Sequence, residues 1–186
     1  MKLLSGILYF TCVNFALAGF HTGAAFANEK GASGSHTIHV NPSLKKKLSQ
    51  ETLDSITKFF EKAEQAISTS NLEALMSLYS DSYRNGDHDK AAAEEIWKRI
   101  FDTFTGMSTM HNMRLVSYDE KSNVIIIGCS GLLLGTPKGQ EDRKPVDTWT
   151  NEEHILTMED GKWKLLGTIG NKRSRLWFDK PMHPLF

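Results

Sequence analysis

The spacing of apolar residues changes once along this chain, near Gly106, and that change most restricts the folds open to it. Before Gly106, apolar side chains recur every three or four residues, which is the spacing of one face of a helix. After it they alternate or form short continuous runs, which is typical of strands. A block of helices followed by a block of strands predicts an α+β domain, with helices packed on one face of an antiparallel sheet.

Three helices are expected in the first half of the chain. The first carries one apolar stripe, formed by Leu53, Ile56, Phe60, Ala63 and Ile67. Residues 70–73 fit a capping box, which predicts a second, shorter helix from Leu72 through Tyr79. Residues 84–87 are expected to break that helix as a turn, and the third helix starts near Asp89. Its predicted buried side carries Ile96, Trp97, Ile100, Phe101 and Phe104.

Four strands are expected in the second half, over residues 111–118, 123–134, 146–159 and 162–171. The pair Asp160 and Gly161 predicts a two-residue hairpin turn that places Glu159 opposite Lys162. Strict alternation from that pair assigns one set of side chains to the interior. This set is Thr150, Glu152, His154, Leu156, Met158, Trp163, Leu165, Gly167 and Ile169.

The opposite, outer face of this sheet is also expected to be partly apolar. Residues 124–134 are apolar on both faces, and alternation places Trp149 beside them, exposed on the outer face. A large exposed apolar patch marks an interaction surface in a soluble protein. The sequence therefore predicts a homodimer formed through the outer sheet face.

The two ends of the chain differ in composition from its centre. Residues 1–27 combine a basic start, an apolar stretch and an Ala-Phe-Ala triplet, which is typical of a cleaved secretory signal peptide. A retained membrane anchor is the alternative, because the apolar run approaches the length that spans a bilayer. We expect a flexible leader over residues 28–45, one domain over residues 46–172 and a surface tail over residues 173–186. The predicted location is periplasmic or secreted, with no stable membrane insertion after cleavage.

Charge and cysteine content limit the partners of the mature chain. The whole chain has 22 basic and 22 acidic residues, and removal of residues 1–27 takes Lys2 away, leaving a net charge near −1. No overall attraction to nucleic acid follows from that balance. Cys129 would be the one cysteine left, inside an apolar run where a thiol usually acts as a small hydrophobe. No paired-cysteine, His-Glu-x-x-His or glycine-rich nucleotide motif is present, so no metal or cofactor is predicted.

Several segments together resemble the nuclear transport factor 2-like superfamily, which includes ketosteroid isomerases and polyketide cyclases of the SnoaL type. They are the helical stretch 70–79, the turn 84–87, the helix with Ile96-Trp97 and Ile100-Phe101, and the closing strand 160–166. The likeness covers about residues 46–172. It implies three N-terminal helices against a curved antiparallel sheet of four or more strands, with a conical pocket. Fold alone does not select one of the superfamily's functions.

An isomerase reading of the resemblance leaves one role unfilled. An ungapped alignment with ketosteroid isomerases places their general-base aspartate near Asp87 and their oxyanion-donating tyrosine near Ala63. Alanine has no proton to donate, and the loss of one such donor costs about 3 to 4 kcal/mol of transition-state stabilisation. Asp87 is therefore a catalytic candidate, with a turn or helix-capping carboxylate as its alternative role.

His154 and Glu152 form the second candidate pair. Residues two apart on a strand share a face, so His154 could act as acid or base while Glu152 orients it. The alternative role is a hydrogen-bonded pair in a pocket wall. Around them we expect a ligand-binding set made of Tyr83, Trp97, Glu152, Leu156, Met158 and Trp163.

These residues predict a mostly apolar pocket with a few polar groups, which suits a small hydrophobic molecule held by one or two hydrogen bonds. The sequence thus favours a small-molecule-binding or accessory, dimerising module. An isomerase, cyclase or dehydratase acting by acid–base chemistry beside a carbonyl is the first alternative. A structural partner in a cell-envelope assembly is the second, and it would need no polar groups in the pocket.

Overall fold

The structure is a computed structural model that describes residues 38–170, and the predicted signal peptide and C-terminal tail lie outside them. Seven strands form one mixed sheet in the order β1-β4-β5-β6-β7-β2-β3. The strands are β1 (Ile38–His39), β2 (Tyr79–Asn85), β3 (His88–Asp89), β4 (Phe104–Asp119), β5 (Val124–Pro137), β6 (Lys144–Glu159) and β7 (Lys162–Ile169). The helices are α1 (Pro42–Lys45), α2 (Gln50–Ser68), α3 (Leu72–Met76) and α4 (Lys90–Thr103). The α+β class expected from the sequence is confirmed.

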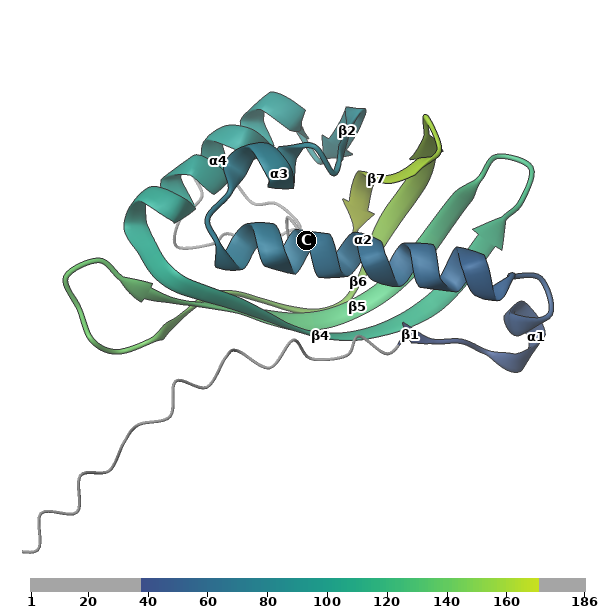
Figure 1. Ribbon diagram of the computed structural model, residues 1–186, viewed down its shortest axis with the longest axis horizontal. Helices are drawn as coiled ribbons and strands as arrows, with labels where there is room; N and C mark the ends of the chain where they lie inside the picture. Colours follow the sequence, from purple (N-terminus) through teal and green to yellow (C-terminus); the bar gives the residue numbers. More distant parts are fainter. Residues whose placement is uncertain (1–37, 171–186) are drawn as a thin grey trace, which may run out of the picture. The chain divides into compact units, whose positions relative to one another are not determined.

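The helices α2, α3 and α4 lie on the same side of the sheet, and we call the sheet face beneath them the inner face (Figure 1). Each begins at a side chain that accepts a hydrogen bond from a free backbone N–H of the first turn. Ser49, Asn71 and Asp89 fill this role for α2, α3 and α4. The apolar stripe of α2 is buried against the sheet, and α2 runs along the curved strands β4, β5 and β6 (Figure 1).

Two predictions about the first half of the chain are wrong. The second helix ends at Met76, and Tyr79 begins strand β2 instead of extending the helix. Strand β2 pairs in parallel with β7, so the sheet is mixed and not wholly antiparallel as predicted, while its seven strands agree with the expected four or more. The segment expected to be a flexible leader contains, in its described part, strand β1 and helix α1.

The four predicted strands in the second half are present, with shifted ends. Strands β4, β5 and β6 extend beyond the predicted bounds at one end or both, whereas β7 ends at Ile169, before the predicted end at residue 171. Strands β6 and β7 pair with Glu159 opposite Lys162, as the turn sequence predicts. Asp160 and Gly161 have φ angles of 49° and 73°. Two successive positive φ values match the right-handed twist of the flanking strands, which explains this turn sequence.

Two bulges change which residues of β6 and β7 face inward. Between the pairs Cys129–Glu152 and Gly131–Trp149, strand β6 has one residue more than β5, and Asn151 there has a φ of 53°. Trp149 is consequently only 4% exposed, and the prediction that it lies on the outer face is wrong. Thr150, predicted to be interior, is exposed. Each extra residue reverses the alternation of side chains beyond it.

The second bulge lies in β7, where Leu166 is the extra residue between the partners of Leu156 and Ile155. Thr168 thereby takes the inner position opposite His154. Ile169, predicted to be interior, is 51% exposed. The inner face near His154 is therefore more polar than strict alternation predicts.

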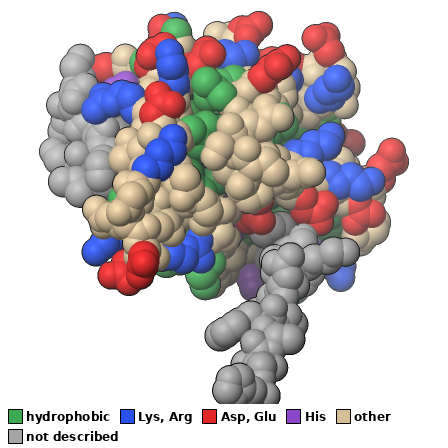
Figure 2. Space-filling view, turned by 60° about the vertical axis from the view of Figure 1, so that its left-hand side comes forward, with side chains coloured by type: hydrophobic (Ala, Val, Ile, Leu, Met, Phe, Trp, Pro, Cys, Tyr) green, Lys and Arg blue, Asp and Glu red, His purple; other side chains and the backbone are tan. Residues whose placement is uncertain are grey.

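The outer face of β4 and β5 carries several apolar side chains. Met110 is 61% exposed and pairs with Leu132, which is half-buried, as is Leu134. With Trp149 on the inner face, this patch is smaller than predicted, and the homodimer remains a prediction. On the face shown in Figure 2, acidic and basic side chains are interspersed instead of being gathered by sign. Among residues 38–170 no helix has the length and apolar character needed to span a membrane.

Candidate functional site

A carboxylate and an imidazole meet between α2 and the inner face of the sheet. Glu64 lies one helical turn after Phe60 on α2, and His111 lies on β4 in phase with the buried residues Met113 and Leu115. The His111 Nε2 atom is 3.6 Å from the Glu64 Oε1 atom. The side chain of His111 is 1% exposed and that of Glu64 is 20% exposed. Of the two side chains, that of Glu64 is therefore the more exposed, although its Oε1 atom is buried.

The other ring nitrogen of His111 faces a buried thiol. His111 Nδ1 lies 3.3 Å from Cys129 Sγ, and the indole N–H of Trp149 donates to the same sulfur at 3.2 Å. The Trp149 and His111 rings are 5.4 Å apart. Burial raises the pKa of the Cys129 thiol to about 11, although the indole hydrogen bond opposes the shift. Cys129 is therefore a protonated thiol at neutral pH, within a polar chain that the sequence did not indicate.

His154 is wholly buried near the same place. Its ring and that of His111 each lie 6.2 Å from the ring of Phe60, and its Nδ1 is 3.5 Å from the hydroxyl oxygen of Thr168. Burial, and then the positive charge that His111 can carry, lowers the pKa of His154 from 6.5 to about 3. A neutral imidazole with so low a pKa is a weak base near pH 7. The acid–base role predicted for His154 is not supported, although its place in the interior is confirmed.

Glu152 is buried as predicted, and its carboxylate lies against the backbone of Gly170. A Cβ atom at Gly170 would stand 1.2 Å from Glu152 Oε2, so any larger residue would displace the carboxylate. Glu152 also lies opposite Cys129 in the pairing of β5 with β6. Because Glu152 and His154 are two residues apart on one strand, their common face was predictable. The close approach of the Gly170 backbone to the Glu152 carboxylate was not.

A second buried polar group joins α4 to strand β2. The indole N–H of Trp97 donates to the Tyr79 hydroxyl at 2.7 Å, and the rings of Tyr79 and Tyr83 meet edge to face at 4.8 Å. Burial raises the pKa values of both phenols. Asn85, also fully buried, interacts with Tyr83. Both phenols therefore keep their protons and serve as neutral hydrogen-bonding groups.

The remaining predicted site residues occupy different environments. Leu156 and Trp163 are buried, and the Trp163 indole donates to the Ser55 hydroxyl on α2 at 2.8 Å. Met158 is half-buried at the hairpin end. Asp87 is exposed in the turn between β2 and β3, whereas the other catalytic candidate, His154, is wholly buried on β6. The structure thus supports the capping-or-turn alternative for Asp87.

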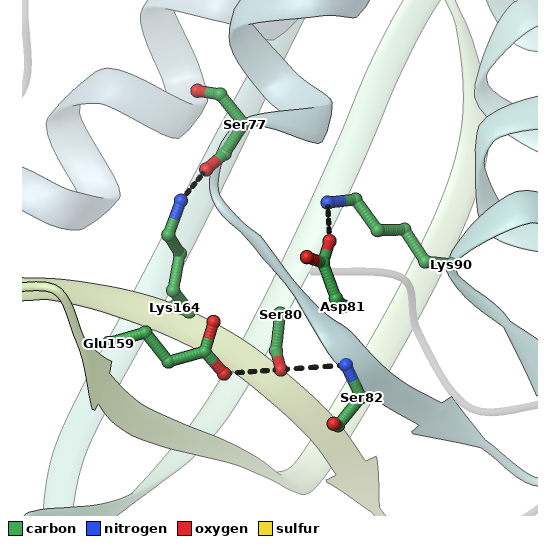
Figure 3. Close-up of polar contacts among 7 residues, drawn as sticks. All are labelled: Ser77, Ser80, Asp81, Ser82, Lys90, Glu159 and Lys164. Atoms are coloured by element: carbon green, nitrogen blue, oxygen red, sulfur yellow. Dashed lines mark hydrogen bonds and ion pairs between the residues drawn. The ribbon is translucent and has the colours of Figure 1, made fainter.

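Strand β2 is held at its place beside β7 by polar contacts (Figure 3). The Ser80 hydroxyl donates to Glu159 at 2.5 Å and accepts from the Ser82 N–H at 3.0 Å. Lys164 donates to the Ser77 carbonyl, and Lys90 pairs with Asp81 at 2.7 Å. Short bonds to a carboxylate are stronger than neutral ones, so this cluster anchors the strand that carries the two buried tyrosines.

No group of three or more His, Cys, Asp or Glu side chains among residues 38–170 is placed to hold a metal ion.

Comparison with known proteins defines the class of fold. No family model matches the chain, and no curated protein sequence matches it. Solved structures do match. A candidate scytalone dehydratase from Novosphingobium aromaticivorans superposes with a TM-score of 0.52 at 13% identity, over 62% of this chain and 80% of that one.

Two further solved structures superpose on this chain to a similar extent. A hexachlorocyclohexane dehydrochlorinase (LinA, type 2) superposes with a TM-score of 0.50 at 12% identity, over 63% of this chain and 82% of that one. A ketosteroid isomerase-like protein from Erwinia carotovora atroseptica gives 0.50 at 15% identity, over 64% and 95%. The described part of the chain has the nuclear transport factor 2-like fold, as the sequence resemblance implied.

Proposed function

We propose that this domain is an acid–base catalyst that moves a proton on a small, largely apolar molecule, as isomerases and lyases do. One observation carries the proposal: the Glu64 carboxylate lies 3.6 Å from the buried imidazole of His111, on the face of the sheet that the helices cover. From the sequence alone, a small-molecule-binding module was favoured over an enzyme. Because of this pair, we now favour the enzyme.

The chemistry available to the pair is proton transfer at carbon. A carboxylate oxygen can accept a proton as a general base when a substrate is held within hydrogen-bond reach of it. It takes a proton from a carbon next to a carbonyl or next to a carbon bearing a leaving group. The electron pair then shifts to form a double bond. The proton returns to another carbon in an isomerisation, or the leaving group departs in an elimination.

The surroundings of the pair favour an apolar, flat substrate. Two aromatic rings lie near the His111 imidazole, with the centroid of Phe60 at 6.2 Å and that of Trp149 at 5.4 Å. The neutral imidazole of His154 adds a polar group that carries no charge near pH 7. Uncharged ring systems with one or two oxygen atoms fit such surroundings better than phosphates or polycarboxylates.

The structural neighbours agree with this reaction class without establishing it. One neighbour is named as a candidate scytalone dehydratase, one as a hexachlorocyclohexane dehydrochlorinase and one as a ketosteroid isomerase-like protein. Their identities to this chain are too low to transfer a substrate, and this fold supports many functions. The proposal therefore depends on Glu64 and His111.

A general-base probe tests the proposal without knowledge of the natural substrate. 5-Nitrobenzisoxazole is a small aromatic compound that opens to a coloured cyanophenolate when a base removes the C–H proton of its isoxazole ring and the N–O bond breaks. We expect saturable turnover by the wild type and a loss of about 100-fold or more in Glu64→Gln, which keeps the shape but removes the base. Glu61→Gln is the matched control, because Glu61 is exposed on the same helix.

Equal rates for wild type and Glu64→Gln would contradict the proposal. Saturable binding of apolar ring compounds with no turnover would support the binding module instead. That alternative has its own support in the buried aromatic residues around the pair, including Phe60 and Trp149.

A further inference from the structure

The interior of β5 and β6 contains a polar chain that ends on the proposed catalytic pair. It runs from the Trp149 indole to the Cys129 thiol, then to Nδ1 of His111, and from Nε2 of His111 to Glu64. Both ring nitrogens of His111 thus face a protein group. Which nitrogen carries the proton decides whether Glu64 or His111 is the base.

The direction of the first contact is fixed by chemistry. An indole N–H only donates, so the Cys129 sulfur is the acceptor from Trp149. The thiol, which burial keeps protonated, retains its own S–H to donate. The atom that faces it is His111 Nδ1, 3.3 Å away, and a neutral imidazole has one nitrogen able to accept.

The contact at the other side of the ring points the same way. Nε2 faces a carboxylate oxygen at 3.6 Å. A lone pair on Nε2 would face the negative charge of that oxygen, whereas an N–H there is attracted to it. The two sides of the ring therefore favour the same tautomer, with the hydrogen on Nε2 and the lone pair on Nδ1.

We propose that Trp149 and Cys129 are positioning residues that hold neutral His111 as the Nε2–H tautomer, and that they thereby make Glu64 the proton acceptor of the site. In the reaction, the proton leaves the substrate carbon for a Glu64 oxygen while His111 keeps its own proton and orients the carboxylate. No bond to Cys129 forms or breaks. The proposal rests on the proposed function for the role of Glu64, but the tautomer itself is independent of turnover.

Gly131, which lies opposite both Trp149 and His111 in the sheet, allows the indole to pack closely at this position. A Cβ atom at Gly131 would lie 2.3 Å from Trp149 Cζ2 and 2.7 Å from the Met110 carbonyl oxygen. The indole therefore packs directly on the backbone of β5, which sets its N–H within reach of Cys129. Any larger residue at this position would push the donor away.

The tautomer is measured by long-range proton–nitrogen correlation NMR on protein labelled with nitrogen-15 in histidine. The two ring nitrogens have distinct shifts according to which one is protonated. Spectra are taken on the alkaline side of the His111 titration, and its signals are assigned by their loss in His111→Gln. We expect Nε2–H in the wild type. Nδ1–H as the main form would overturn the proposal.

A variant series separates the thiol from the carboxylate. In a Glu64→Gln background, where the carboxylate no longer biases the ring, Cys129→Ala should change the ratio of tautomers about two- to tenfold toward Nδ1–H, the range of one neutral hydrogen bond. Cys129→Ser should restore the wild-type ratio, because a hydroxyl also donates and accepts. An unchanged ratio in Cys129→Ala would remove the positioning role.

These outcomes are separable from those of the proposed function. If the probe reaction fails while the Nε2–H tautomer and its dependence on Cys129 are found, the site is preorganised but does not act as a base. If turnover depends on Glu64 while His111 is an Nδ1–H tautomer, the proposed acid–base function is supported and the positioning role of Trp149 and Cys129 is refuted.

Discussion

Replacement of Trp163 by alanine tests whether the β6–β7 hairpin packs against α2 as described. The Trp163 ring is buried, and its N–H donates to the Ser55 hydroxyl at 2.8 Å. Truncation of a buried tryptophan costs about 3–5 kcal/mol, because apolar contacts are lost and a cavity is left. In a protein of this size, that loss lowers the melting temperature by roughly 10 °C.

The hydrogen bond accounts for a small share of that cost. Ser55 still donates to the Thr52 carbonyl at 2.7 Å after the indole is removed, so only an acceptor site is vacated. Trp163→Phe, which keeps most of the ring, should therefore cost only about 1 kcal/mol for the lost bond, plus a small packing term. Urea unfolding of the three proteins, followed by far-ultraviolet circular dichroism, gives the comparison. A loss below about 1 kcal/mol in Trp163→Ala would mean that the ring does not pack on α2.

The remaining predictions concern the interior, the pH dependence and the outer face. Gly131→Ala should destabilise by about 1–3 kcal/mol through overpacking against Trp149, with a shift in tryptophan fluorescence; an unchanged melting temperature would contradict that contact. The pKa of His154 is about 3 in the folded protein and near 6.5 in the unfolded chain. Between these pH values only the unfolded state binds the proton. The free energy of unfolding should therefore fall as the pH drops from 6.5 toward 3, by about a kcal/mol per pH unit. His154→Gln should flatten that slope and exposed His39→Gln should leave it, as measured by urea unfolding at each pH; equal slopes in all three would refute the assignment. The outer face with Met110 and Leu132 is predicted to join two copies, so sedimentation should show a dimer that Leu132→Arg dissociates; a wild-type monomer at micromolar concentration would end that idea.

The elements of the fold were largely predictable, because their signals are local. The stripe of α2, the capping residue Asp89 and the turn at Asp160 and Gly161 all act within a few residues of themselves. Tyr79 was misassigned because its apolar spacing continues that of α3, while pairing with the distant strand β7 decides its conformation. A tertiary contact of this kind leaves no signal in the local period.

The site was predictable only in part, for two physical reasons. The parity of His111 with Met113 and Leu115 does place it inside, but nothing local shows that Glu64 on α2 faces it. The bulges at Asn151 and Leu166 reverse the faces of Trp149 and Thr168, and strict alternation cannot anticipate them. The sequence thus located His154 and Glu152 correctly and missed the pair that they accompany.

The central claim is that Glu64 and His111 act as one unit, and a double-mutant cycle on the probe reaction measures that most directly. Glu64→Gln, His111→Gln and the double variant are compared with the wild type by kcat/KM for 5-nitrobenzisoxazole, after circular dichroism has shown that all four are folded. Residues that act as a unit give strongly non-additive losses. The account predicts a double variant no slower than the slower single variant. Losses that multiply, so that each change costs the same with or without the other, would contradict it.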